Sequence, residues 1–127
     1  MRTILKDIGQ EIAQNTVLNT MFSTRVFSTP PKNEPTSAYM IFSRTRRVRN
    51  DVRNVDRILF EIYSTTVLDL ENAADALLAQ FDGATQIGTD NNSYFTIQFI
   101  EESDNPIPVK DTGMLVKLLY FDFMKTS

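Results

Sequence analysis

Residues 39 to 64 read YMIFSRTRRVRNDVRNVDRILFEIYS, and this stretch decides the fold. Two extended runs, 39 to 49 and 52 to 63, flank Asn50-Asp51, a pair that tolerates the positive φ angles of tight hairpin turns. The pattern therefore predicts a long β-hairpin. With Asn50 and Asp51 as a two-residue loop, the core face of the hairpin pairs Tyr39 with Ile62, Ile41 with Phe60 and Ser43 with Ile58.

The distal half of this hairpin is crowded with arginine. Of the eight arginines in the chain, six lie there: Arg44, Arg46, Arg47, Arg49, Arg53 and Arg57. The predicted register sets Arg44 opposite Arg57, and like charges directly opposed in a sheet are unfavourable. We therefore expect the distal hairpin to protrude from the body of the domain and to contact something else.

These six arginines are the candidate contact site. Strand alternation predicts Arg44 and Arg46 on one face and Arg47 and Arg49 on the other. One interpretation is a solvated hairpin whose arginines pair with acids of the same chain, namely Asp51, Asp56 and Glu61. The other is contact with an acidic surface or with phosphate, because the arginine fork suits both kinds of oxygen. The net charge of −3 leaves the rest of the chain acidic, which favours contact between copies of the protein.

Outside the hairpin, apolar spacing predicts two main helices. The first carries Ile4, Leu5, Ile8 and Ile12 at helical intervals, and the poor helix formers at 15–16 and 19–20 predict a break after it. The second begins after a Thr66 N-cap, with Asp69 three residues on, and ends at Gly83. Its predicted apolar stripe is Val67, Leu70, Ala74, Leu77, Leu78 and Phe81.

Alternating apolar residues predict two more strands, at 93–100 and 115–123. Prolines predict a loop at 28–37, and an exposed loop at 101–113. The element order is then α-β-β-α-β-β. This order indicates an α+β fold, with a mainly antiparallel four-stranded sheet, two main helices and a long protruding β-hairpin, in a single domain over 1–127.

The composition excludes most catalytic chemistry. The chain has no cysteine and no histidine, so thiolate and Ser-His-Asp catalysis and the common zinc sites are ruled out. Four acids around one loop, Glu101, Glu102, Asp104 and Asp111, match no calcium-loop spacing, and we interpret them as solvated. No glycine-rich phosphate motif occurs. We expect no enzyme activity, no cofactor and no metal.

The chain carries no sequence signal for a membrane. Its longest apolar runs, such as Tyr39 to Phe42, are far shorter than the ~20 residues that cross a bilayer. Because the chain has no cysteine, its fold depends on no disulfide and needs no oxidising compartment. We expect assembly in the cytoplasm.

The succession of elements is similar to that of a known family. An N-terminal helix and a Pro-containing loop precede the aromatic-rich strand Tyr39-Met40-Ile41-Phe42, which enters the basic hairpin; the strand 58–64 and the alanine-rich helix 70–80 follow. This order resembles the tail-terminator, or tail-completion, proteins of long-tailed (siphovirus-type) bacteriophages and related tail-like particles. The resemblance covers nearly the whole chain.

The resemblance implies a structural virion protein located at the head-tail interface of the tail. Such a protein forms a hexameric ring that docks on the last ring of the major tail tube protein, stops polymerisation, and presents its other face to a head-completion or connector protein. The resemblance also implies that genomic DNA passes through the lumen without sequence-specific binding. The family has no catalytic residues to transfer, so the six arginines are chosen as the subunit or tail-tube contact from this sequence alone.

A rival from another class is a small nucleic-acid-binding protein that inserts the basic hairpin into a groove as a β-ribbon. The negative net charge and the lack of a helix-turn-helix pattern count against it. A third alternative, an enzyme that works through carboxylates alone, lacks paired acids on rigid elements.

Overall fold

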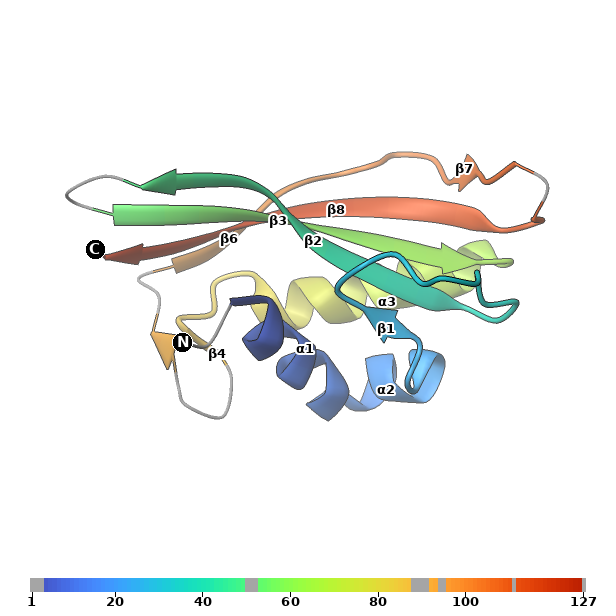
Figure 1. Ribbon diagram of the computed structural model, residues 1–127, viewed down its shortest axis with the longest axis horizontal. Helices are drawn as coiled ribbons and strands as arrows, with labels where there is room; N and C mark the ends of the chain where they lie inside the picture. The colour runs from blue at the N-terminus through green and yellow to red at the C-terminus, as the bar shows by residue number, and fades with distance from the viewer. Residues whose placement is uncertain (1–3, 50–52, 88–91, 94–95, 111, 127) are drawn as a thin grey trace.

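Three helices cover one face of a long sheet (Figure 1). The computed structural model describes residues 4–49, 53–87, 92–93, 96–110 and 112–126. The helices are α1 (Ile4–Gln14), α2 (Thr16–Phe22) and α3 (Val67–Phe81). The predicted α+β class is confirmed.

The sheet has six strands of mixed orientation. Its four long strands are β2 (Tyr39–Arg49), β3 (Arg53–Ser64), β6 (Thr96–Glu102) and β8 (Leu115–Thr126). They pair antiparallel in the order β2-β3-β8-β6. Two short strands complete the sheet: β1 (Val26–Phe27) runs parallel to β2, and β7 (Ile107–Pro108) pairs with β8.

The four predicted strands are present, but the prediction of a four-stranded sheet is wrong. β1 and β7 have two residues each, which is too short to show a period of two in the sequence. β7 also lies inside the segment 101–113 that we expected as a loop. A separate pair of short strands, β4 (Gln86–Ile87) and β5 (Asn92–Ser93), was not predicted either. The predicted loop at 28–37 contains neither helix nor strand.

The core lies between the helices and the sheet, and phenylalanine rings occupy its centre. The ring centroid of Phe60 on β3 lies 5.7 Å from that of Phe81 on α3 and 5.5 Å from that of Phe121 on β8. All three side chains are fully buried, as are Ile8 and Ile12 of α1. Burial of each such side chain stabilises the fold by roughly 1.5–3 kcal/mol.

The helix ends follow the sequence signals closely. The Thr66 side chain accepts a hydrogen bond from the Asp69 backbone N–H at 3.3 Å and caps α3, while Gly83 just after the helix adopts a φ of +82°. The predicted break falls at Asn15. Its side chain accepts from the Leu18 N–H at 3.1 Å, so the chain restarts as a third helix, α2, where we had predicted two main helices.

The predicted hairpin register is wrong by one residue. Tyr39 pairs with Tyr63, Met40 with Ile62 and Phe42 with Phe60. Met40 and Phe42 therefore enter the main core, whereas Tyr39 and Ile41 lie on the opposite face in a smaller cluster. The pattern could not decide this, because all four residues from 39 to 42 are apolar or aromatic and both faces of the strand are buried here.

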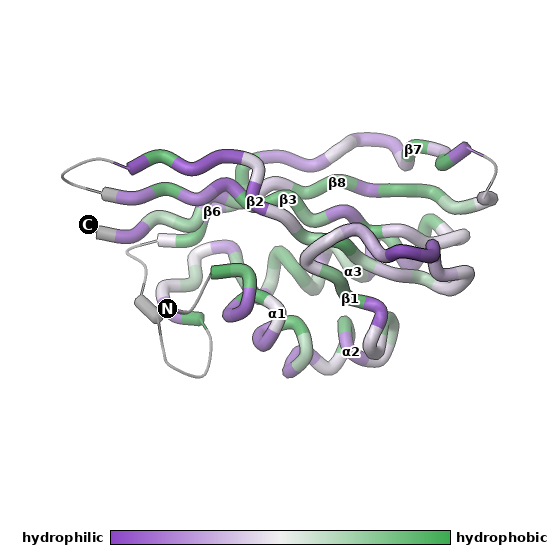
Figure 2. The backbone as a smooth tube through the Cα atoms, viewed as in Figure 1, coloured by the Kyte–Doolittle hydropathy of each residue, from purple (hydrophilic) through white to green (hydrophobic). Residues whose placement is uncertain are grey.

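The hairpin is not an isolated protruding ribbon. β3 pairs with β8 along its whole length, from Arg53 opposite Thr126 to Ser64 opposite Leu115, so the distal half is part of a sheet of at least three strands. Figure 1 shows that this end of the sheet extends past the helices. Figure 2 shows that the distal part of β2 is strongly hydrophilic. The predicted Asn50-Asp51 loop lies outside the described residues.

Candidate functional site

The six predicted arginines share one end of the sheet, here called the basic end. Four lie on β2 and two on β3. A β-bulge between Arg44 and Arg46 sets their directions: Arg44 pairs with Ile58, and Arg46 pairs with Arg57. The predicted pairing of Arg44 with Arg57 is therefore wrong. The side chain of Arg53 lies outside the described part of the chain.

The bulge also changes which arginines share a face. Arg44 lies on the core side because its partner Ile58 does, and past the bulge Arg47 falls on the same side, opposite Asp56. Arg49, opposite Asn54, shares this side with Arg47, whereas Arg46 lies on the other side, opposite Arg57. The predicted shared face of Arg47 and Arg49 is therefore confirmed, but the predicted shared face of Arg44 and Arg46 is wrong, because one inserted residue shifts the alternation between them.

Asp56 is a buried carboxylate among these arginines, with 8% of its surface exposed. One of its oxygens, Oδ1, lies 3.7 Å from Arg44 Nη1 and 3.7 Å from Arg47 Nε. The same oxygen accepts no hydrogen bond from the described residues. Burial raises the pKa of Asp56, and the charges of Arg49 and Arg44 lower it by less, so its pKa lies above the usual value.

Arg57 is neutralised inside its own chain. Its Nε donates to Asp122 Oδ1 at 2.8 Å and its Nη2 donates to Asp122 Oδ2 at 3.0 Å, a bidentate pair. These hydrogen bonds raise the pKa of Arg57 above its usual value. Asp122 also explains how Arg46 can lie opposite Arg57, because it cancels one of the two like charges.

The interpretation as arginines paired with the named acids of the same chain is thus confirmed for two of the six, Arg44 and Arg47, and Arg57 pairs with an acid that was not named. Asp56 pairs with Arg44 and Arg47, as predicted. Glu61 instead accepts a hydrogen bond from the Tyr63 hydroxyl. Asp51 lies outside the described residues. Asp122 was missed. It is separated from Arg57 by 65 residues, and only strand order brings the two together.

Arg46 and Arg49 remain as exposed cations. Within the described part of the chain, neither has a carboxylate within 4 Å. They lie on the outer strand of the sheet, where β1 pairs with Met40 and Ile41 and no described strand continues beyond. Charged side chains and a bulge on an edge strand discourage indiscriminate strand pairing. The outer edge of β2 at the basic end is therefore lined by charged side chains.

The described residues form no cluster of acidic side chains that could bind a metal ion. Of the predicted acidic loop cluster, Glu102 pairs with Lys117, with 3.1 Å between Oε2 and Nζ, and Asp111 lies outside the description. None of the helices in the described ranges is long and apolar enough to cross a membrane.

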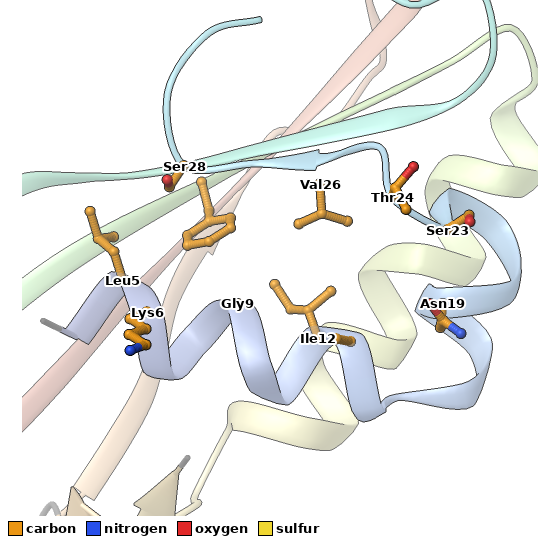
Figure 3. A pocket seen from close by; sticks show the side chains of 11 residues that line it. Leu5, Lys6, Gly9, Ile12, Asn19, Ser23, Thr24, Val26 and Ser28 are labelled. Atoms are coloured by element: carbon orange, nitrogen blue, oxygen red, sulfur yellow. The ribbon is translucent and has the colours of Figure 1, made fainter. Parts of the chain in front are cut away.

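A cavity lies between α1 and β1. Its volume is about 650 Å³, and Leu5, Ile12 and Val26 point into it (Figure 3). Its lining is mixed, because hydroxyl and amide side chains line it as well: Asn19, Ser23, Thr24 and Ser28. Lys6 is the one charged residue of the lining, and no carboxylate is present among the described residues that line it.

Comparison with known proteins gives a match in fold. No protein-family model and no curated protein matches the chain in sequence. Among solved structures, a chain from the virion of a native gene transfer agent (GTA) particle superposes with a TM-score of 0.73 at 15% sequence identity. The match covers 98% of this chain and 95% of that one. The two chains therefore share a fold over essentially their whole lengths.

Proposed function

We propose that this chain is a structural protein of a virion and acts without catalysis. The observation that carries the proposal is the full-length fold match to a chain of a gene transfer agent virion. The surfaces of the chain are consistent with this proposal. The basic end and the α1–β1 cavity are available for contacts, and the described residues form no metal-binding cluster.

Within that class, we propose the role of a tail terminator. A hexameric ring of this chain would cap the tail tube, end its polymerisation and contact the head connector, and DNA would pass through its lumen. The resemblance in element order supports this role. An acidic body supports it too, since passing DNA would be repelled from an acidic channel wall.

The basic end would supply contacts in this assembly. Arg46 and Arg49 are exposed and unpaired within the described residues, so an acidic neighbour would gain two charge-assisted contacts. The rival role as a β-ribbon in a nucleic-acid groove is less favoured. β3 is held between β2 and β8, and three of the arginines already meet carboxylates.

Deletion of the coding sequence from the producing strain tests the proposal. We expect tails that exceed their normal length and fail to join heads in electron micrographs, with both defects reversed by the chain supplied in trans. Mass spectrometry of purified wild-type particles should detect the chain. Absence of the chain from the particles, or normal particles after deletion, would contradict the proposal.

A further inference from the structure

A groove between α2 and α3 forms a second surface with no partner in the described residues. Its volume is about 780 Å³, and Met21 and Ala76 contribute apolar lining. Val17, also in its lining, is 50% exposed. An exposed apolar groove on a small soluble chain indicates a contact surface.

The polar lining of this groove is acidic. Asp69 is partly engaged, because its Oδ2 accepts a hydrogen bond from the Ser64 hydroxyl at 3.0 Å. Asp75 is exposed and makes no ion pair with the described residues. Arg25 contacts Met21 of the lining, but its guanidinium donates to the carbonyls of Met21 and Ala38 at 3.0 and 2.8 Å and thereby caps the end of α2. The groove lining itself contains no cation among the described residues.

The groove and the basic end cannot meet within one chain. Arg46 lies opposite Arg57 on β3, and the stretch from Arg57 to Ser64 spans roughly 23 Å. Figure 1 shows α3 beginning at the end of the sheet opposite to the distal tip of β2 and running back beneath the sheet. The span along β3 exceeds the screening length of about 8 Å at physiological salt. Each surface therefore needs a partner from outside the chain.

We propose that the α2–α3 groove receives the basic end of a second copy of this chain. Arg46 and Arg49 lie on opposite faces of the edge strand β2, so the groove of the next copy receives this edge with one arginine on each side, near Asp75 and Asp69, over an apolar contact centred on Val17. Complementary charge on the two surfaces favours a second copy over an unrelated partner. The contact is head-to-tail, and such contacts close into rings when the rotation between copies permits. The inference rests on the proposed ring and identifies its subunit interface.

Engineered cysteines test the contact directly, because the chain has no cysteine of its own. Thr45→Cys and Asn72→Cys place one thiol at each surface and keep every charge. A link within one chain would leave a monomer, so only links between copies give larger species. We expect a bifunctional maleimide to give a ladder of dimers and larger species from the double variant, in concentrated protein or in purified particles. Thr45→Cys with Lys32→Cys, which places the second thiol on an exposed loop, should give no ladder.

Charge reversal tests the specificity of the same contact. In the background of the two cysteines, Arg46→Glu with Arg49→Glu should reduce cross-linking at least tenfold, and so should Thr20→Arg with Asp75→Arg. Combining all four charge substitutions should restore it, because the charges are again complementary. Circular dichroism of each variant checks that the fold is retained.

The outcomes separate this inference from the proposed function. Particles that contain the chain but yield no ladder in either setting would overturn the inference and leave the virion role intact. A ladder from a chain that is absent from particles would support the interface and contradict the virion role. Salt-dependent DNA retention lost in Arg46→Glu with Arg49→Glu, with cross-linking unchanged, would assign the basic end to nucleic acid and overturn the inference.

Discussion

At the scale of single residues, Asp56 is the most informative group of the basic end. It is the one buried acid facing three arginines, yet its pKa is raised, because burial outweighs the attraction of Arg49 and Arg44. A charged Asp56 therefore holds the arginines in place and costs folding free energy. The geometry agrees, since its Oδ1 lacks a hydrogen bond from any described residue.

This balance predicts that Asp56→Asn stabilises the chain at pH 7, which means that the free energy of unfolding rises. At a pH well below the unfolded-state value near 3.9, the wild-type Asp56 is protonated in the folded and unfolded states, so it contributes no charge penalty. As the pH rises from there through the raised folded-state pKa, the wild type loses stability that the neutral asparagine retains. Urea unfolding at low pH and at pH 7 measures the difference, which should grow with pH.

Asp122→Asn is the matched control for this substitution. Asp122 accepts two short hydrogen bonds from Arg57, so its loss should lower the unfolding free energy by about 1–2 kcal/mol at pH 7. If Asp56→Asn were as destabilising as Asp122→Asn at neutral pH, Asp56 would be a net stabilising ion pair and our account of its burial would be wrong.

At the scale of elements, Lys117 ties three of them together. It lies on β8 with 3% of its side chain exposed. Its Nζ lies 3.3 Å from Glu71 Oε1 on α3 and 3.1 Å from Glu102 Oε2 on β6, and it donates to the Ser103 carbonyl at 3.0 Å. Burial lowers the pKa of Lys117, but these two carboxylates more than offset the burial and raise it overall.

We predict that Lys117→Ala lowers the unfolding free energy by about 1–3 kcal/mol at pH 7. This loss of free energy of unfolding is smaller than for a fully buried ion pair. Glu71 and Glu102 are partly exposed, so water can hydrate their carboxylates once the Lys117 ammonium is removed. Because the pKa is raised, the contribution of Lys117 is complete below the unfolded-state value near 10.4 and disappears at higher pH. Denaturant unfolding from pH 7 to 11 should show the gap between wild type and variant closing, whereas Lys32→Ala should match the wild type throughout.

The long elements could be predicted from the sequence because each carries a local signal. α3 has its Thr66 cap and Gly83 stop, and β3 alternates Ile58, Phe60 and Ile62. The features that were predicted wrongly depend on contacts between segments that are distant in the sequence. The β2 register was ambiguous over four apolar residues, and the Thr45 bulge inverted the faces of the arginines beyond it. Asp122 became the partner of Arg57 only through the pairing of β3 with β8.

At the scale of the whole molecule, the fold separates two surfaces of opposite character. The sequence alone indicated a basic segment on an acidic body. It could not locate the acidic counterpart, because Val17 and Asp75 come from different helices that meet only in the folded chain. The long strands then keep the basic end away from this groove, so the chain carries a basic surface toward one end and an acidic groove toward the other.

The proposed contact between copies should be sensitive to salt. Screening shortens from about 10 Å at 0.1 M salt to about 3 Å at 1 M, so the attraction between Arg46, Arg49 and Asp75 should weaken over that range. We expect sedimentation velocity to show at least tenfold weaker self-association at 1 M salt. Val17→Ser should weaken association at every salt concentration and leave the salt dependence unchanged, because it removes apolar contact alone. Association that strengthens with salt, and is abolished by Val17→Ser, would instead assign the interface to apolar burial and remove the arginines from it.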